Sequence, residues 1–348
     1  MSKGFSIGRL CRQGVLAISG FACAATGALA ATDLIELKVD ESAKAAVATS
    51  TLVFRHARPA SHSGTSPKAL EFRSTAAAGT AGSGANLTGN RYPADLDYHG
   101  GPVVTSLVSH SIFVNPSATC PVPGCWGDPV TFLNDLGQSK FVHIIDQYVG
   151  ASHNNRYTTG VNFVTTFTPP ATPLTDAFIQ AIVASAVSVT GAVGYGNEYH
   201  VFLPPGQDLC FTSGSTICYS PDVPATFYFC AYHGSFDLPG VGHVLYSAEP
   251  YAAVPGCSDT GASPNGTVID STNNTLSHEL FETITDPDGD AWTNTTGNGL
   301  YGEEIGDECS FVNATGFDPS IFHVNGKTYA AQPEYSNYTH ACSTNPEY

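Results

Sequence analysis

The chain is poor in positive charge. Its 348 residues contain 13 Lys and Arg against 30 Asp and Glu, a formal charge of −17, and only 12% of the residues are charged. Proteins that bind nucleic acids or anionic membranes rely on clusters of Lys and Arg, so the composition argues against both kinds of partner. With 42% hydrophobic residues the chain has enough apolar material for a core, which excludes a wholly disordered protein. We expect a globular protein with an acidic surface.

The basic residues that do occur are concentrated near the N-terminus, and residues 92–348 keep three of them against 25 acids. The chain begins with scattered Lys and Arg, followed by an apolar run over residues 14–30 that ends in Ala28-Leu29-Ala30. This order predicts a secretory signal peptide over residues 1–30. An uncleaved membrane anchor is the alternative, because the run is about as long as the shortest spanning helices. No second run of that length follows, so we expect no membrane contact after signal cleavage.

Large apolar residues are almost absent from residues 74–89, which are rich in Ala, Gly, Ser and Thr. A segment of this kind buries too little surface to offset the entropy lost on ordering. We therefore interpret residues 31–91 as a pro-segment or flexible arm, with one short ordered element near residues 51–55. The folded domain is expected over residues 92–348. Export would place it outside the cell or in the cell envelope.

The sequence has no Cys-x-x-Cys pair, which makes a cysteine-bound zinc ion the less favoured interpretation of its cysteines. Cys11 and Cys23 belong to the signal peptide, and an even eight remain in a chain destined for an oxidising compartment. Disulfides are therefore expected. Short loops favour the first two of the following pairs, which leave the other two: Cys120–Cys125, Cys210–Cys218, Cys230–Cys257 and Cys309–Cys342.

Runs of β-branched and aromatic residues predict strands, and apolar residues at helical spacing predict helices. The expected strands are residues 101–115, 199–203, 226–232 and 243–248, and the expected helices are residues 140–149, 174–189 and 271–285. Loops and short strands are expected after Trp292. The order of elements predicts an α/β (α+β) fold: a single disulfide-stabilised domain in which helices pack on a mixed β-sheet.

The last of these helices carries the strongest chemical signal. Its apolar residues share one face, whereas His278 and Glu282 lie one turn apart near the opposite side. The same spacing occurs in the H-E-x-x-H helix of metallopeptidases, where two ligands bind zinc and the intervening Glu polarises the bound water. Here the pattern is H-E-x-x-E, which predicts a zincin-like active-site helix with Glu279 as the catalytic base. A surface ion pair of His278 with Glu282 is the alternative.

A catalytic zinc ion needs a third protein ligand. Glu304 is the first choice, because gluzincin-type peptidases, which the helix resembles, take their third ligand from a Glu at a similar downstream distance. Glu303 and Asp307 come next, and Asp307 alternatively orients His278 from outside the ligand shell. His233 is a further candidate, as a ligand or as a donor to the transition state.

A cation is also favoured by the local charge, because residues 270–308 contain ten acids and neither Lys nor Arg. Repulsion among these carboxylates has no cationic relief nearby, and a bound cation would supply it. The loop Asp286-x-Asp288-Gly289-Asp290 is a second cation candidate, with alternating oxygen ligands that suit calcium. It lacks the glycine placement and the closing Glu of an EF-hand loop.

Three anchors in the sequence resemble the EXORDIUM/phosphate-induced protein family. They are Tyr98-His99-Gly100-Gly101-Pro102-Val103, the segment from Phe229 to His233, and the run from Ser277 to Trp292 with the following Glu304-to-Cys309 segment. The resemblance covers residues 95–315 and suggests the microbial branch of the family. Family members are secreted and are associated in plants with the cell wall and growth control. The resemblance therefore implies an extracellular location, with cell-wall polysaccharide as one expected partner.

The leading hypothesis is a secreted zinc-dependent hydrolase, a metallopeptidase that acts on extracellular protein or peptide. His278, Glu282 and Glu304 hold the metal in this hypothesis, and Glu279 is the general base. A non-catalytic protein that binds cell-wall polysaccharide through surface aromatics such as Trp126 and Trp292 is the alternative. A third hypothesis keeps the cation and gives it a structural role.

Overall fold

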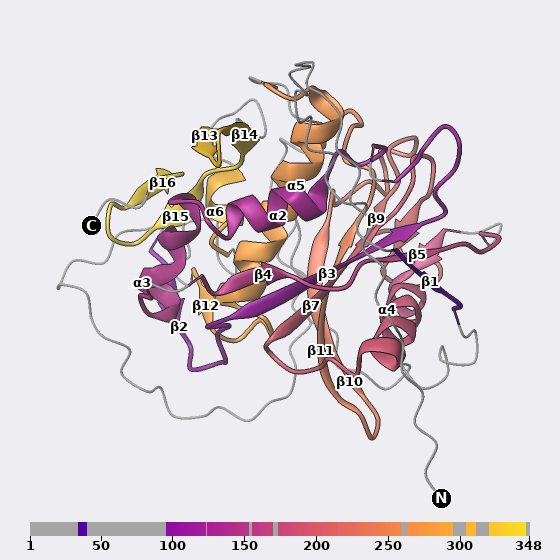
Figure 1. The fold of residues 1–348 in the computed structure, drawn as a ribbon, viewed down its shortest axis with the longest axis horizontal. Coiled ribbons are helices and arrows are strands. Elements are labelled where there is room, and N and C mark those ends of the chain that lie inside the picture. Colours follow the sequence, from indigo (N-terminus) through magenta and orange to yellow (C-terminus); the bar gives the residue numbers. More distant parts are fainter. Residues whose placement is uncertain are drawn as a thin grey trace, which may run out of the picture. The chain divides into compact units, whose positions relative to one another are not determined.

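A seven-stranded mixed β-sheet forms the centre of the structure, a computed structural model that describes residues 34–39, 95–122, 124–152, 155–169, 173–258, 263–294, 304–310 and 320–345. Its strands are β1 (Ile35–Leu37), β3 (Leu107–Val114), β4 (Tyr157–Thr159), β5 (Phe163–Thr165), β7 (Asn197–Phe202), β10 (Tyr232–Leu238) and β11 (Gly242–Glu249). They follow the order β1-β5-β3-β7-β11-β10, and β4 also pairs with β3 (Figure 1). All pairs are parallel except β10 with β11, so β10 ends the sheet as an antiparallel strand.

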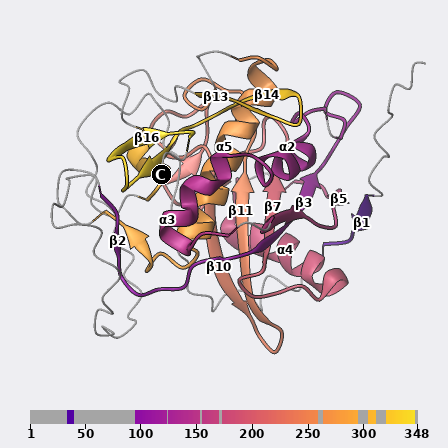
Figure 2. The same ribbon diagram turned by 60° about the vertical axis from the view of Figure 1, so that its left-hand side comes forward.

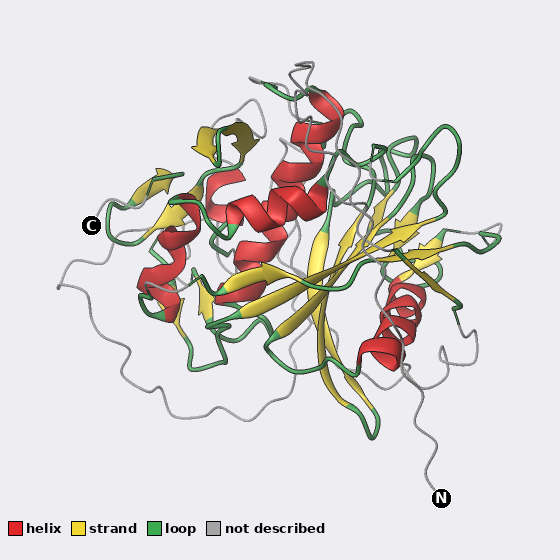
Figure 3. Cartoon of the chain, in the orientation of Figure 1, coloured by secondary structure: helices red, strands yellow, loops and turns green. Residues whose placement is uncertain are grey.

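Helices cover both faces of the sheet (Figures 2 and 3). They are α2 (Pro129–Leu136), the 3₁₀ helix η1 (Phe141–Ile145), α3 (Asp146–Val149), α4 (Asp176–Thr190), α5 (Thr267–Thr285) and α6 (Asp307–Ser310). On one face, Ile179 and Ile182 of α4 join a cluster of buried apolar strand residues. On the other face, Leu280 and Phe281 of α5 form a second cluster with residues of α2, η1 and α3. The predicted fold class, a single α+β domain with helices packed on a mixed sheet, is confirmed.

The two faces of the central strands differ in polarity because successive strand side chains point to opposite sides. Tyr199 and Tyr246 face α4 and pack into its apolar cluster. Glu198 precedes Tyr199 on β7 and points the other way, because Thr283 of α5 donates a hydrogen bond to its Oε1 (2.8 Å). Ser247, next to Tyr246 on β11, is also buried. The space beneath α5 is therefore polar although it is buried.

Most of the long elements were predicted correctly. The expected helices at residues 140–149, 174–189 and 271–285 appear as η1 with α3, as α4 and as α5. The strands expected at residues 199–203 and 243–248 are β7 and β11, and β3 occupies the second half of the strand expected at residues 101–115.

The strand predicted at residues 226–232 is wrong, because the strand there begins only at Tyr232. The aromatic residues before it, Phe227 and Phe229, are instead buried in the cluster under α4 as part of an irregular segment. Their apolar character reflects burial and not a strand. Helix α2 and the short strands β4 and β5 were not predicted, although Asp128 caps α2 by accepting a hydrogen bond from the Thr131 amide (3.2 Å).

Short two- and three-stranded sheets surround this core. They consist of β2 (Asp97–Tyr98) with β12 (Trp292–Thr293), β6 (Leu174–Thr175) with β8 (Leu209–Cys210) and β9 (Cys218–Tyr219), β13 (Ser320–Val324) with β14 (Lys327–Ala331), and β15 (Glu334–Ser336) with β16 (Ala341–Ser343). Short strands after Trp292 were expected. The strand β1, however, lies upstream of the expected domain start at residue 92 and pairs with β5 inside the central sheet. The ordered element expected near residues 51–55 and the signal peptide lie outside the described residues.

All four predicted disulfides are present: Cys120–Cys125, Cys210–Cys218, Cys230–Cys257 and Cys309–Cys342. They are typical of a chain that folds in an oxidising compartment. Among the described residues, none of the helices combines the length and the apolar character that a membrane crossing requires.

The acids of the domain are divided between its surface and its interior. More than half of the acids in residues 92–348 are buried: Asp135, Asp146, Asp176, Glu198, Glu249, Asp270, Glu279, Glu282, Asp286, Glu304, Asp307, Glu308 and Glu334. Composition gives the number of acids but not whether each one is exposed or buried. Here more than half are buried.

Candidate metal centre

Helix α5 is buried along nearly its whole length, from Asp270 to its end at Thr285. The helix starts with Asp270 in its first turn, where the side chain accepts two hydrogen bonds from Asn265 (2.8 Å each), and Pro287 prevents its continuation. Its apolar residues lie on one side as predicted, and they pack against α2 and η1. Its polar side carries His278, Glu279 and Glu282, and each of these three residues is 0% exposed. The alternative of a surface ion pair is therefore wrong.

Three of the predicted ligands converge as a first group. His278 Nε2 lies 3.0 Å from Glu282 Oε1 and 3.8 Å from Asp307 Oδ1, and the three ligand atoms lie within 4.8 Å of one another. Two ligand atoms bound to the same tetrahedral zinc ion at ordinary bond lengths would be about 3.4 Å apart. The observed distances bracket that value, so a zinc ion fits this group after small side-chain shifts.

A second group lies on the other side of Glu282. His233 of β10 places its Nδ1 3.3 Å from Glu279 Oε2 and 3.6 Å from Glu282 Oε2, and these three atoms also lie within 4.8 Å of one another. The other ring nitrogen, Nε2, lies 3.4 Å from the backbone carbonyl of Asp286, which can only accept a hydrogen bond. Nε2 therefore carries a proton, and Nδ1 faces the two carboxylates, to which it donates when the ring is charged.

Glu304, the first choice for the third ligand, belongs to this second side. Its Oε1 lies 3.8 Å from His233 Nε2, whereas Asp307 completes the group around His278 and Glu282. Glu303 lies outside the described residues. The structure thus brings all six predicted site residues together, and we call them the His/carboxylate cluster: His233, His278, Glu279, Glu282, Glu304 and Asp307.

The pKa values of the cluster show how strongly it attracts positive charge. Burial disfavours a charged imidazole, but the nearby carboxylates of Glu282 and Glu279 outweigh it and raise the pKa of His278 to about 9. The same competition, led by Glu304, raises the pKa of His233 well above its usual value. Burial raises the pKa of Glu279, whereas the two histidines overcome burial at Glu282 and hold its pKa well below the usual value. A bound divalent cation would meet the same demand for positive charge.

The loop that carries Glu304 and Asp307 approaches α5 very closely. A Cβ atom on Gly306 would lie 2.5 Å from His278 Nδ1 and 3.0 Å from Glu282 Oε1, so only glycine fits there. The backbone amide of Asp307 donates to Glu282 Oε1 (3.1 Å). The disulfide of Cys309 with Cys342 ties this segment to β16. The spacing of the acids could not reveal this close approach.

Gln332 was not predicted and contacts the cluster directly. Its Nε2 donates to the carbonyl of Gly306 (2.5 Å) and to His278 Nδ1 (3.0 Å). Nε2 of His278 lies on the side of Glu282. A cation bound through Nε2 leaves the ring proton on Nδ1, which the Gln332 amide accommodates only after turning away.

Three further buried glutamates line the same polar space and were also not predicted. They are Glu198 on β7, Glu249 on β11 and Glu334 on β15, each at most 1% exposed. Burial raises the pKa of Glu198 to about 8 and that of Glu249 and Glu334 well above the usual value. Each has at least one carboxylate oxygen without a hydrogen-bond partner. The alternation of Glu198 and His200 with aromatic and apolar residues was the one sequence signal that a buried strand carries titratable groups.

Other residues singled out in the sequence have structural surroundings. Trp126 is buried and donates to the carbonyl of Leu203 (2.9 Å), so its prediction as a surface aromatic is wrong. Trp292 is half-buried, packs on Tyr98 and Tyr148, and donates to the carbonyl of Tyr148 (3.0 Å).

The Asp286–Asp290 loop does not gather its acids around one point. Asp286 Oδ1 accepts from the amide of Ala291 (2.7 Å), whereas Asp288 accepts from Ser235 (2.7 Å) and Tyr195 (2.6 Å). Within the described ranges, this loop forms no group of three converging ligand atoms. Calcium binding there stays a prediction.

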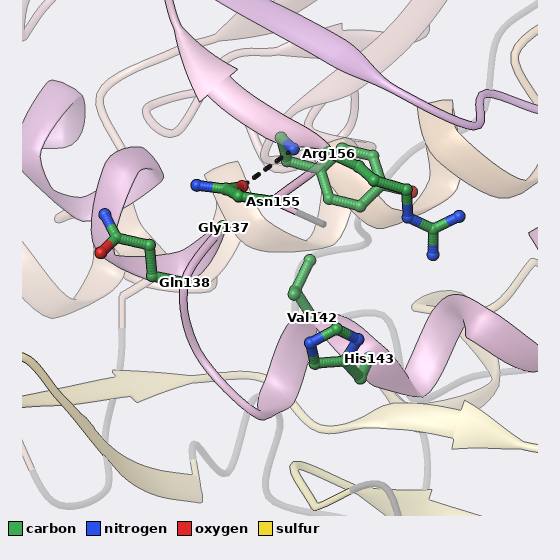
Figure 4. A pocket seen from close by; sticks show the side chains of 7 residues that line it. Gly137, Gln138, Val142, His143, Asn155 and Arg156 are labelled. Carbon is green, nitrogen blue, oxygen red and sulfur yellow. Dashed lines mark hydrogen bonds between the residues drawn. The ribbon is translucent and has the colours of Figure 1, made fainter. Parts of the chain in front are cut away.

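A small cavity of about 250 Å³ opens elsewhere, between the end of α2, η1 and β4 (Figure 4). Figure 4 shows Asn155, Arg156, Val142 and His143 around it. The guanidinium of Arg156 is already engaged by Asp146 and by the carbonyl of Gly150 (2.7 Å). This cavity is lined by none of the cluster residues.

Comparisons with protein-family models, with curated protein sequences and with solved structures found no significant match for this chain. The resemblance to the EXORDIUM/phosphate-induced protein family therefore stays a prediction.

Proposed function

We propose that this protein is a secreted hydrolase that depends on a divalent cation bound in the His/carboxylate cluster. The observation that carries the proposal is the convergence of the cluster residues from three distant segments, β10, α5 and residues 304–307 at the start of α6, into one buried site. Packing alone gives no reason to bury so many carboxylates, since each uncompensated charge costs several kcal/mol. Perturbed acids and histidines in one place are typical of functional sites.

In this proposal His278, Glu282 and Asp307 hold the cation. Zinc suits a set of one nitrogen and two oxygen ligands, and when bound it supplies Lewis acidity and lowers the pKa of a coordinated water to near 7. Glu282 keeps its position because the Asp307 amide donates to it. Glu279 lies on the adjoining side of α5, and its Oε1 is buried without a hydrogen-bond partner. This oxygen accepts the proton of the attacking water, and His233 holds the opposite oxygen, Oε2, in place.

The H-E-x-x-E pattern on the helix favours a peptide bond as the substrate, by analogy with metallopeptidases. Four disulfides and the predicted signal peptide support an extracellular location, with extracellular protein or peptide as the substrate. Of the two tryptophans named for polysaccharide binding, Trp126 is buried and Trp292 packs on Tyr98 and Tyr148, so neither supports that alternative.

A structural cation is the second candidate, and complete burial of the cluster favours it. His233, His278, Glu279, Glu282 and Glu304 are each 0% exposed, and structural metal sites are characteristically closed. A substrate would reach the cluster only after part of the surrounding chain moves. The two candidates therefore differ in whether removal of the cation abolishes a reaction or only lowers stability.

The test uses the full-length chain secreted from an oxidising host. Metal content is measured by mass spectrometry, and cleavage is followed on a peptide library and on a denatured protein. We expect zinc in the wild type, and a Glu279→Gln variant that still binds zinc through His278, Glu282 and Asp307 but no longer hydrolyses peptides. A His243→Gln variant, altered at a histidine outside the cluster, is the matched control and should keep both properties. Metal-free protein with full activity would refute the proposal, and bound zinc without hydrolysis of any substrate supports the structural role.

A further inference from the structure

The two oxygens of Glu282 face two different histidines. Oε1 lies 3.0 Å from Nε2 of His278, and Oε2 lies 3.6 Å from Nδ1 of His233. Each oxygen therefore belongs to a separate group of three ligand atoms, one completed by Asp307 and one completed by Glu279. A carboxylate placed in this way can bridge two cations, because two-metal hydrolytic sites hold their ions about 3.5–4 Å apart.

The group around His233 is prepared for an ion of its own. Its Nδ1 faces Glu279 and Glu282, and the Asp286 carbonyl holds a proton on Nε2, so a cation that binds Nδ1 replaces only the proton on that atom. Its distances to Glu279 Oε2 (3.3 Å) and Glu282 Oε2 (3.6 Å) bracket the separation of about 3.4 Å expected for ligands of one zinc ion. All three side chains are 0% exposed, and Glu282 Oε2 and Glu279 Oε1 have no hydrogen-bond partner. These unpartnered buried oxygens are positioned to bind a cation.

We propose that the cluster binds two divalent cations bridged by Glu282, the second one held by His233 and Glu279. This inference rests on the proposed function and extends it. Glu279 binds the second ion through Oε2 only, which leaves Oε1 free to accept a proton. Two divalent ions also carry the same amount of charge as the four carboxylates of the cluster, with opposite sign, whereas one ion balances only half of it.

The test counts ions in the full-length chain. Protein stripped with a chelator is titrated with Zn²⁺ alone by calorimetry, and bound zinc is then measured by mass spectrometry. We expect two equivalents in the wild type, one in His233→Asn, one in His278→Asn and two in the control His243→Asn. Glu282→Gln, which changes the bridge, should weaken both equivalents. Circular dichroism establishes that each variant is folded before its zinc is counted.

A second measurement asks whether the two ions share a bridge. Wild-type protein loaded with Mn²⁺ should give the paramagnetic resonance spectrum of an exchange-coupled pair, and His233→Asn should give that of an isolated ion. One equivalent of zinc in the wild type, lost in His278→Asn, would overturn the second site and leave the proposed function standing. No binding of any ion would overturn both. Two equivalents with uncoupled Mn²⁺ spectra would overturn the bridge by Glu282.

Discussion

Buried acids lie on both faces of the central sheet, and the two faces differ in the hydrogen-bond partners that they offer to these acids. On the side of α4, Asp176 accepts hydrogen bonds from the hydroxyls of Tyr232 (2.8 Å) and Tyr246 (2.6 Å) and from the amide of Gln180 (2.6 Å). On the side of α5, Glu279 and Glu282 have oxygens with no such donor and meet mainly histidines. A buried acid that only supports the fold is satisfied by neutral donors. We propose that the unsatisfied acids on the side of α5 are the ones that bind a cation.

The same strands serve both sides. Tyr232 and His233 are neighbours on β10, and alternation sends the tyrosine to Asp176 and the histidine to Glu279. Asp176, at the start of α4, is therefore a reference for the cluster, because it packs against the same sheet and is equally buried. Variants on the two sides can be compared within one protein.

The largest expected difference is the response to zinc. An ion present at 100 times its dissociation constant stabilises a protein by about 2.7 kcal/mol, so two ions give about 5 kcal/mol. We expect this gain in the wild type and in Asp176→Asn but not in Glu282→Gln, measured by urea denaturation with and without Zn²⁺. An equal gain in Glu282→Gln would place the zinc elsewhere and remove the contrast between the two sides.

The disulfides offer the next comparison. Cys309–Cys342 closes a separation of 33 residues and holds the loop of Asp307, whereas Cys210–Cys218 closes 8 residues at β8 and β9. Replacing each pair by serine should cost about 4 and about 2.5 kcal/mol of unfolding free energy, respectively. Only the first replacement should weaken zinc binding, by calorimetry. A similar loss of affinity in both would mean that zinc responds to general stability and not to the loop.

The pH dependence of stability tests the buried acid on the α4 side of the sheet, Asp176. Burial outweighs the three hydrogen bonds and raises the pKa of Asp176 from 3.8 to about 6. The folded state therefore holds this proton more tightly than the unfolded state. Its stabilising effect is fully present below pH 4 and is lost as the pH rises to about 6, a change of about 3 kcal/mol.

Asp176→Asn should remove this slope, which denaturant titrations at pH 4, 5, 6 and 7 would show. The asparagine keeps an oxygen for the two tyrosine hydroxyls, so the variant should fold. A slope that persists unchanged would mean that other buried acids, such as Glu198, produce it.

Features of the site that depend on neighbouring residues in the sequence could be predicted, whereas features that depend on contacts between distant segments could not. The i, i+4 spacing of His278 and Glu282 is local, and the helix followed from it. The disulfide pairs followed from loop length and elimination. His233 was named as a candidate site residue. Its position beside Glu279, however, depends on the packing of β10 against α5, which no local sequence pattern encodes.

What could not be predicted lies in contacts between distant segments. Asp307 and not Glu304 completes the group of His278, because Gly306 lets the backbone approach within 3.1 Å of Glu282 at that residue. Gln332 and Glu334 follow an unremarkable alanine pair in the sequence. The strand at residues 226–232 was misplaced because burial in an irregular segment selects the same aromatic residues as a strand does.

The smallest expected effect is the pH-dependent contribution to stability of His243, a histidine that contacts two acids outside the cluster. His243 lies 2.9 Å from Asp288 and 2.9 Å from Asp237, and Asp288 outweighs burial to raise its pKa from 6.5 to about 8. Its stabilising effect is present below pH 6.5 and is lost as the pH rises through 8. Because the site is half-buried and screened by solvent, the loss should be about 1 kcal/mol.

Unfolding of the wild type and of His243→Gln at pH 6 and pH 9 measures this effect as the difference between the two proteins. Zinc should leave it unchanged, since His243 responds to protons alone, whereas His233 and His278 should respond to zinc at either pH. A zinc-dependent shift at His243 would show that nearness to carboxylates is enough to bind the ion. The unpartnered oxygens beneath α5 would then no longer distinguish a metal site from an ordinary ion pair.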